Sequence, residues 1–140
     1  ASFICLCMGD IAIPFASSQD HKARDEGDVG PNTGGMGAYS PAPVIDNVLN
    51  NRILSSIVLP TLKGMSDEGR PYTGFLYAGL MIDERGDPRV LEYNCRFGDP
   101  ETQPIMMRLK TDLVSAVLQM MSGGGGNLSL EFDDKVAHAN

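Results

Sequence analysis

Residues 90–102 read Val90-Leu91-Glu92-Tyr93-Asn94-Cys95-Arg96-Phe97-Gly98-Asp99-Pro100-Glu101-Thr102, and the rest of the chain is organised around this stretch. Its first half predicts a strand, because valine, leucine and tyrosine favour strands, and side chains two residues apart on a strand share a face. Glu92 and Asn94 are therefore expected on one face, with Leu91 and Tyr93 on the opposite face against a core. A carboxylate beside a carboxamide suits a hard divalent cation such as Mg²⁺, and Arg96 could meet a phosphate or carboxylate. The alternative is a solvated strand edge followed by a surface arginine.

The composition of the 140 residues is that of one globular domain with a core. The chain has 11 Lys and Arg against 18 Asp and Glu, a net charge of -7 without a basic patch, so nucleic acid is not an expected partner. No apolar run approaches the length that spans a bilayer, so no membrane partner is expected. Cys5, Cys7 and Cys95 form no C-x-x-C pair, which favours a reducing, cytoplasmic compartment over a disulfide framework or a zinc site.

Hydrophobic periodicity predicts the order of strands and helices. Residues 3–8 and 11–16 should form a hairpin around Gly9-Asp10, followed by a helix from Ile45 that is capped by Asp46 and kinked or split at Pro60. Residues 73–82 and 90–94 should form a second hairpin, in which 73–82 is an interior strand. Helices are expected at 101–109 and 112–121, the latter with these residues inward: Leu113, Val114, Val117, Leu118 and Met121. This order indicates an α+β two-layer sandwich with an antiparallel sheet and helices on one face.

Residues 17–41 carry no apolar periodicity and are expected to form a long loop. Gly34, Gly35 and Gly37 would let the backbone approach an anion closely. The polar and aromatic residues around them would be unusual in a flexible linker, which is the alternative: Asn32, Thr33, Met36 and Tyr39. Asp20-His21-Lys22 lies near the start of this segment and is either a substrate site or a structural group, since histidine titrates near neutral pH and lysine can meet phosphate.

Three stretches together resemble the phosphoribosylamine–glycine ligases, a family of ATP-grasp enzymes of de novo purine synthesis: residues 18–22 (SQDHK), 30–43 (GPNTGGMGAYSPAP) and 72–104. The resemblance implies that residues 1–140 are the C-terminal subdomain of an ATP-grasp module, with the nucleotide-binding N-terminal half and a following domain absent. The lack of an initiator methionine at Ala1 fits this expectation. Among ATP-grasp relatives a further acidic metal ligand often lies on the preceding strand, where this sequence has Gly79.

The resemblance also implies a reaction in which ATP, glycine and 5-phosphoribosylamine react through glycyl phosphate. Glu92 and Asn94 would hold Mg²⁺ or Mn²⁺ on the phosphates of ATP, and Arg96 would be the catalytic arginine. The expected substrate-binding residues are Asp20, His21, Lys22, Asn32, Thr33, Gly34, Gly35, Gly37, Asp99 and Glu101, with a helix cap as the alternative role of Asp99. The full-length protein would be a monomer.

Two other kinds of function are kept as alternatives. One is an ATP-grasp-like module that binds a ligand without turnover, which would be expected to lose its metal ligands. The other is an interaction domain that uses the long loop to bind a partner.

Overall fold

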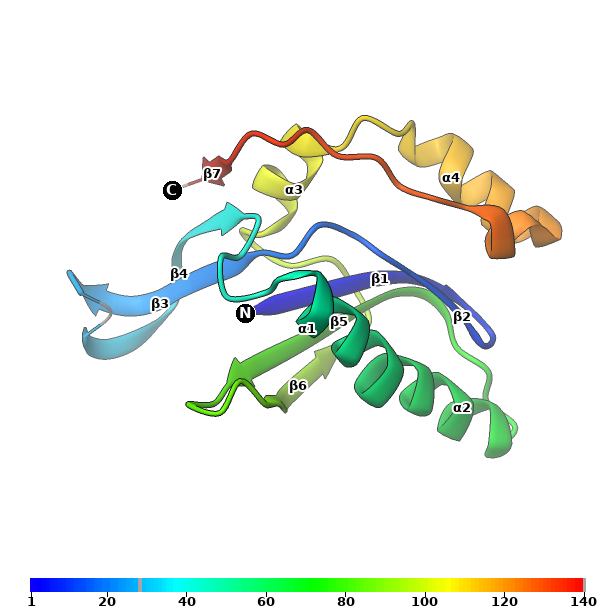
Figure 1. Ribbon diagram of the computed structural model, residues 1–140, viewed down its shortest axis with the longest axis horizontal. Helices are drawn as coiled ribbons and strands as arrows, with labels where there is room; N and C mark the ends of the chain where they lie inside the picture. Colours follow the sequence, from blue (N-terminus) through cyan, green and yellow to red (C-terminus); the bar gives the residue numbers. More distant parts are fainter. Residues whose placement is uncertain (28, 140) are drawn as a thin grey trace.

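The computed structural model describes residues 1–27 and 29–139, and its centre is a four-stranded antiparallel sheet (Figure 1). The strand order is β2 (Ile11–Pro14), β1 (Ser2–Met8), β5 (Thr73–Ile82) and β6 (Pro88–Asn94). The two expected hairpins are confirmed, with β5 inside the sheet. Along β1, Phe3, Cys5 and Cys7 join one buried cluster, whereas Ile4 and Leu6 join another. The strand is apolar on both sides because both faces of the sheet are covered.

One face of the sheet is covered by a continuous helical segment. α1 (Asn47–Ile53) continues through a π-helical turn, Leu54–Val58, into α2 (Leu59–Asp67). Asp46 caps the helix as expected, because its Oδ1 accepts a hydrogen bond of 2.7 Å from the Leu49 N–H. The break expected at Pro60 takes the form of the π turn just before it. A proline lacks an N–H and crowds the carbonyl four residues earlier, and a widened turn accommodates both effects.

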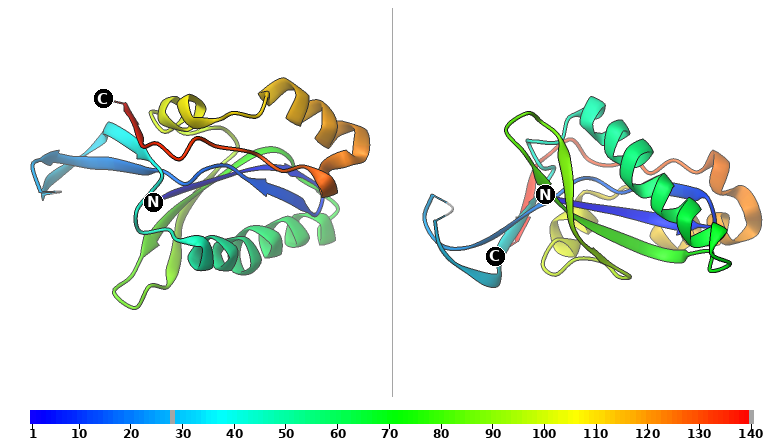
Figure 2. Two further views of the ribbon diagram at one scale, coloured as in Figure 1. Left: turned by 45° about the horizontal axis from the view of Figure 1, so that its top comes forward. Right: turned by 90° about the horizontal axis from the view of Figure 1, so that it is seen from below.

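The opposite face is covered by α3 (Thr102–Arg108) and α4 (Leu113–Gln119), followed by a π turn (Met120–Gly124) and a 3-10 turn (Gly125–Asn127). The α+β class with an antiparallel sheet is confirmed, but the helices lie on both faces rather than one, so the sheet is the middle of three layers (Figure 2). Among the described residues, no helix is long and apolar enough to cross a membrane.

The inward face of α4 differs from the expected one. Val114, Leu118 and Met121 are 66%, 60% and 65% exposed. The residues that pack against the core are Leu113, Ala116, Val117 and Met120. Both sets have helical spacing, and only the position of the sheet distinguishes them.

A second antiparallel sheet replaces the long loop expected at 17–41. Its order is β3 (Gln19–Asp25), β4 (Val29–Ser40) and β7 (Ala137–Ala139), and the β3–β4 hairpin projects from the body (Figure 1). The pairing of β3 with β4 shifts register twice, after His21 and after Ala23. The sequence did not predict this hairpin, because strands are recognised by alternating apolar side chains. A glycine-rich strand that pairs through its backbone groups needs no such alternation.

Arg108 ties this second sheet to α3. Its side chain is 8% exposed, and it donates hydrogen bonds to the Ser40 Oγ at 2.8 Å and to the carbonyls of Asp133 and Lys135 at 2.8 Å. Ser40 in turn donates to the Ser17 carbonyl at 2.7 Å. These bonds satisfy a buried cation with neutral oxygens and hold the base of the β3–β4 hairpin against α3.

β6 is an edge strand with both faces accessible, which corrects the expected division into a core face and a chemical face. Leu91 is 65% exposed and Tyr93 is 42% exposed, and neither is in a core cluster of the described residues. The register shifts where Gly79 pairs with Glu92 and Leu80 with Val90, so that Leu91 is the extra residue of a bulge. Tyr93 lies toward α2, with its hydroxyl 2.8 Å from the Thr61 Oγ1.

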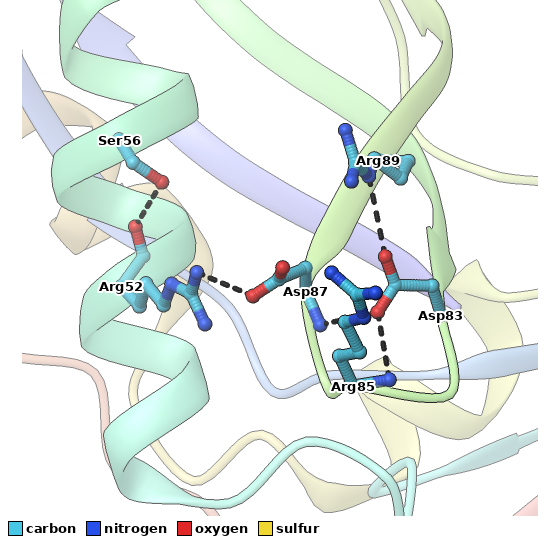
Figure 3. Close-up of polar contacts among 6 residues, drawn as sticks. All are labelled: Arg52, Ser56, Asp83, Arg85, Asp87 and Arg89. Carbon is cyan, nitrogen blue, oxygen red and sulfur yellow. Dashed lines mark hydrogen bonds and ion pairs between the residues drawn. The ribbon is translucent and has the colours of Figure 1, made fainter.

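The turn between β5 and β6 is held together by polar contacts and is tied to α1 (Figure 3). The Asp83 Oδ1 accepts hydrogen bonds from the Arg85 and Asp87 N–H groups at 3.0 and 2.9 Å. Asp87 also pairs with Arg52 of α1 at 2.6 Å, and Asp83 pairs with Arg89 at 3.3 Å. The backbone hydrogen bond from Asp87 is the largest of the effects that lower the pKa of Asp83 below its usual value.

Candidate active site

A small polar cavity lies where the start of β3, the middle of β5, the end of β6 and the loop before α3 meet. Its volume is about 90 Å³, and its lining residues are Asp20, Lys22, Tyr77, Glu92, Arg96, Gly98, Asp99 and Glu101. The folding of the chain thus brings together two segments that the sequence singled out, although about 70 residues separate them. A larger hollow of about 790 Å³ lies near Gly9, Leu59 and Lys63 and contains none of the predicted site residues. We place the site by its chemistry, not by the size of the hollow.

Glu92 and Asn94 lie on one face of β6, as expected. They pair with Gly79 and Tyr77 of β5, and cross-strand partners point to the same side of a sheet. Glu92 lines the cavity, whereas Asn94 is not one of its lining residues. The Lys22 Nζ is 3.9 Å from the Glu92 Oε1, and both side chains are half exposed. The cavity therefore has a carboxylate and an ammonium group at its open side.

A divalent cation would find oxygen ligands but no complete cage here. The described residues contain no group of three or more histidine, cysteine, aspartate or glutamate side chains that could hold a metal ion. Glu92 and Asn94 nevertheless fit Mg²⁺, which commonly takes one or two protein oxygens and completes its shell with water and phosphate. A Cβ at Gly79 would lie 3.0 Å from the Glu92 Cγ. The glycine at this position leaves room for the Glu92 side chain, and a further acidic ligand there would compete with it for space.

Glu101 is the most deeply buried charged residue of the site, at 2% exposure. Its Oε1 accepts hydrogen bonds from the Ser2 Oγ at 2.8 Å and from the Tyr77 hydroxyl at 3.0 Å. Its Oε2 has no hydrogen-bond partner. This oxygen lies against Gly98, where a Cβ would collide with it. One carboxylate oxygen is thus fixed by two hydroxyls, and the other is left as an acceptor at the cavity.

Asp20 provides a second buried acceptor. Its Oδ1 is inaccessible to solvent and has no hydrogen-bond partner. Burial, and then the negative charge of Glu101, raise the pKa of Asp20 above its usual value, although Lys22 and His21 act in the opposite direction. Burial also raises the pKa of Tyr77, so its hydroxyl remains a hydrogen-bond donor at neutral pH.

Arg96 and Asp99 line the same cavity from the loop before α3, and both are exposed. The Arg96 Nη1 donates a hydrogen bond of 2.7 Å to the Phe97 carbonyl, which bends the side chain back over its own loop. The N-cap position of α3 is occupied by Glu101, without a side-chain cap bond. The alternative role of Asp99 as the helix cap is therefore wrong.

The other predicted substrate residues lie on the β3–β4 hairpin, away from the lining of the small cavity. The His21 ring is 5.2 Å from the Tyr39 ring, and the Thr33 Oγ1 donates to the Lys22 carbonyl at 3.0 Å. Gly37 pairs with His21 in the ladder. The side chain of Asn32 and the surroundings of Gly34 and Gly35 lie outside what the structure describes.

Sequence reasoning missed three residues of the site. Ser2 and Tyr77 hold the Glu101 carboxylate, and Gly98 gives it space. Ser2 and Tyr77 sit in strands whose apolar pattern signals only a core. Gly98 stands in the stretch 96–101, and its spacing from Glu101 could have suggested a contact across the turn.

A wider cavity of about 320 Å³ adjoins the small one through shared lining residues, namely Asp20, Lys22 and Tyr77. Its other walls include the apolar residues Leu80, Met81 and Leu91. A charged recess therefore shares residues with a larger cavity that has an apolar wall, and polar groups beside an apolar wall are typical of sites for small molecules.

Comparisons with known proteins identify relatives of the whole chain. Residues 1–102 match the model of the phosphoribosylglycinamide synthetase ATP-grasp (A) domain. Phosphoribosylamine–glycine ligase of Salmonella typhimurium is 56% identical over 137 residues, which are 98% of this chain and 32% of that protein. The ligase of Vibrio parahaemolyticus is 63% identical over 118 residues, 84% of this chain and 28% of that protein. The chain thus spans about a third of the length of these relatives.

Solved structures of known proteins have folds similar to that of this chain. The crystal structure of phosphoribosylamine–glycine ligase from Thermotoga maritima matches with a TM-score of 0.83 and 36% identity, covering 98% of this chain and 34% of that one. The biotin carboxylase domain of Hydrogenobacter thermophilus 2-oxoglutarate carboxylase, in complex with MgADP and bicarbonate, matches with a TM-score of 0.63 at 16% identity. That match covers 98% of this chain and 28% of that one, and at this identity it supports the fold alone.

Proposed function

Because the chain belongs to the phosphoribosylglycinamide synthetase family of ATP-grasp proteins, we propose that it forms the metal- and substrate-binding part of a phosphoribosylamine–glycine ligase. The proposed reaction joins glycine to 5-phosphoribosylamine and gives glycinamide ribonucleotide, ADP and phosphate. The observation that carries the proposal is the gathering of Lys22, Glu92 and Arg96 with the buried Glu101 around one cavity. Residues 1–140 would be the C-terminal subdomain of the ATP-grasp module in a longer chain.

The chemistry requires two successive displacements. A carboxylate oxygen of glycine attacks the γ-phosphorus of ATP, and ADP leaves. The amine of phosphoribosylamine then attacks the carbonyl carbon of glycyl phosphate, and phosphate leaves. Both steps gather negative charge on phosphoryl oxygens, so catalysis depends on positioning and on fixed positive charge. Lys22 and Arg96 supply that charge at the cavity.

Glu92 and Asn94 are the proposed ligands of a divalent cation, Mg²⁺ or Mn²⁺. When bound, the ion would neutralise charge on the ATP phosphates. The contact of 3.9 Å between Lys22 and Glu92 keeps the lysine ammonium beside these ligands, where it would reach the same phosphates. ATP, glycine and 5-phosphoribosylamine are thus the proposed partners of the site.

The β3–β4 hairpin is the proposed support for phosphoribosylamine. His21 and Thr33 belong to the same paired strands as the glycine-rich segment of β4, and Asp20 and Lys22 extend from β3 into the cavity. Backbone N–H groups beside Gly34, Gly35 and Gly37 could bind the phosphate of this substrate. Cys5, Cys7 and Cys95 are not joined in disulfides, which agrees with the proposed cytoplasmic location, and a monomeric full-length chain is part of the same proposal.

The test uses a protein of full length that contains this chain. Phosphate release should require ATP, glycine and phosphoribosylamine together, and mass spectrometry should detect glycinamide ribonucleotide. Glu92→Gln should abolish most of the turnover, whereas Glu84→Gln, the same chemical change at an exposed turn residue of the same hairpin, should not. Phosphate release without dependence on glycine would refute the proposed function.

A further inference from the structure

Arg108, in the last turn of α3, is a buried charged residue that the proposed reaction does not use. Its Nη1 donates a hydrogen bond to the Ser40 Oγ, its Nη2 to the Asp133 carbonyl and its Nε to the Lys135 carbonyl, each at 2.8 Å. All three acceptors are neutral, so they repay the desolvation of a cation only in part. A guanidinium group donates in fixed directions, however, and these bonds therefore define how three segments lie relative to α3.

Ser40 connects Arg108 to the start of the β3–β4 hairpin. Its Oγ accepts the bond from Arg108 and donates to the Ser17 carbonyl at 2.7 Å, and both serines are buried. β3 begins two residues after Ser17, and Asp20 and Lys22 extend from it into the cavity. The strand that carries two residues of the site is thus tied to Arg108 through a single buried hydroxyl.

The other end of α3 is tied to the same part of the chain. Glu101, at the N-cap position, accepts a hydrogen bond of 2.8 Å from the Ser2 Oγ. Ser2 and Ser18 form a bridge of two backbone hydrogen bonds, at 2.7 and 3.2 Å. Ser18 directly follows Ser17, so the two ends of the seven-residue helix are linked to adjacent residues. We therefore expect α3 to set the distance between the loop before it and the base of the hairpin.

The two carbonyl groups that Arg108 binds belong to the segment that leads to β7, close to α3 in Figure 1. β7 pairs with β4, and Ser40 lies opposite Ala137 in that ladder. The Asp133 N–H also donates to the Arg108 carbonyl at 2.7 Å. One guanidinium group therefore holds the base of β4 directly and also through its neighbouring strand.

We propose that Arg108 is a positioning residue for the binding of phosphoribosylamine. By holding the base of the β3–β4 hairpin on α3, it keeps Lys22 in place relative to Arg96, which lies in the loop before α3. This inference rests on the proposed function, in which the hairpin supports that substrate. Without the clamp the two strands would stay paired, but their base could shift against α3, and a misplacement of about 1 Å can cost about 10²-fold in rate.

The alternative is that Arg108 contributes only to stability. A destabilised enzyme has fewer folded molecules, so its turnover falls at every substrate concentration while each KM stays the same. A displaced hairpin would instead raise the KM for phosphoribosylamine. The bonds of Arg108 reach β4 and the approach to β7, whereas Glu92 and Asn94 lie on β6, so the Mg²⁺ dependence should hardly change.

The kinetic experiment uses the full-length ligase with Arg108→Lys and Ser40→Ala. Lysine keeps the charge but lacks the planar fork, and Arg108→Lys should raise the KM for phosphoribosylamine about tenfold. Ser40→Ala keeps Arg108 and its carbonyl bonds but removes the link to Ser17, and should raise the same KM about fivefold. In both variants the Mg²⁺ concentration for half-maximal activity should change less than about twofold. Arg70→Lys, the same change at an exposed position, should alter none of these quantities.

Amide hydrogen exchange tests the clamp without reference to the reaction. In Arg108→Met and in Ser40→Ala, the amides of the β3–β4 ladder at 19–21 and 37–39 should exchange about tenfold faster than in the parent. The amides that pair β1 with β5 should exchange at the parental rate. Should Arg108→Met fail to fold, Ser40→Ala provides both measurements.

Two results would overturn the inference. Parental exchange of the hairpin amides in Ser40→Ala and in folded Arg108→Met would show that the clamp does not hold the hairpin. Faster exchange together with a parental KM for phosphoribosylamine would make Arg108 a structural residue only. Absence of phosphoribosylamine-dependent turnover in the parent enzyme would instead refute the proposed function and with it the role in binding, and the exchange rates would still decide whether Arg108 holds the hairpin.

Discussion

Gly98→Ala tests how tightly the Glu101 carboxylate is held. The added Cβ would lie 2.6 Å from the Glu101 Cδ and 3.0 Å from its Cβ, and closer still to the Oε2. Glu101 cannot move away freely, because it is 2% exposed and its Oε1 is bound by the Ser2 and Tyr77 hydroxyls. Either these charged hydrogen bonds are lost, at about 1.5–3 kcal/mol each, or the core is overpacked, at about 1–3 kcal/mol. We expect Gly98→Ala to lower the free energy of unfolding by about 2–3 kcal/mol.

The same substitution should be nearly harmless when Glu101 is alanine. The contacts to the carboxylate are then absent, and the remaining contact of 3.0 Å between two Cβ atoms needs a shift of only tenths of an ångström. A double-mutant cycle of parent, Gly98→Ala, Glu101→Ala and the double variant should therefore give a coupling free energy of about 1.5 kcal/mol or more. Urea unfolding of the four proteins measures it. Losses that add within about 0.5 kcal/mol would refute the geometry described for Glu101.

Three further predictions concern the neighbouring residues. Asn94→Ala should lower kcat about 10²-fold, which corresponds to about 3 kcal/mol. The Tm should change little, because Asn94 serves the metal site and not the core. Steady-state kinetics over a Mg²⁺ titration checks this, and turnover equal to that of the parent would remove Asn94 as a ligand. Gly79→Ala should displace the Glu92 carboxylate by tenths of an ångström and raise the Mg²⁺ concentration needed for half-maximal activity about tenfold. The free energy of unfolding should change by less than about 1 kcal/mol. An unchanged Mg²⁺ titration would contradict the close packing of the two residues. The pKa of Asp20 is raised in the fold, so its contribution to stability is present at low pH and is lost as pH rises through the folded pKa. Asp20→Asn should therefore raise the Tm at pH 7, and this gain should vanish below the usual pKa of 3.8. A gain in Tm that does not depend on pH would argue against burial as the cause of the raised pKa.

The sequence was sufficient where local rules and packing agree. The hairpin at β1–β2, the cap at Asp46 and the interior position of β5 follow from turn chemistry and from apolar periodicity. These features depend on residues that are close in the chain.

The sequence was insufficient where the outcome depends on which elements meet. The inward face of α4 and the exposure of Leu91 are decided by the position of the sheet and by its edge, and periodicity carries no information on either. The β3–β4 hairpin is held by backbone pairing and by Arg108, which lies 68 residues from its partner Ser40. A residue such as Arg108, in the last turn of a short helix, has no local feature that marks it as a buried clamp.

The candidate site also has residues that the sequence predicts and features that only the fold reveals. Glu92 and Asn94 were predictable because a strand places alternate residues on one face. Resemblance to a family pointed to Glu101, but its burial, the two hydroxyls that hold it and the free Oε2 became apparent only from the fold. Ser2 is 99 residues from Glu101, and no spacing rule connects positions that far apart.

The most direct test of the proposed ligase is the fate of the carboxylate oxygens of glycine. Glycine labelled with ¹⁸O in its carboxylate is supplied with ATP and phosphoribosylamine to the full-length protein, and the released phosphate is analysed by mass spectrometry. If the carboxylate attacks the γ-phosphorus, the C–O bond of glycyl phosphate breaks when the amine attacks, so each phosphate should carry one glycine oxygen. The Glu92→Gln variant should form little labelled phosphate in the same time. Phosphate released without the label, whether or not the amide product forms, would contradict the account.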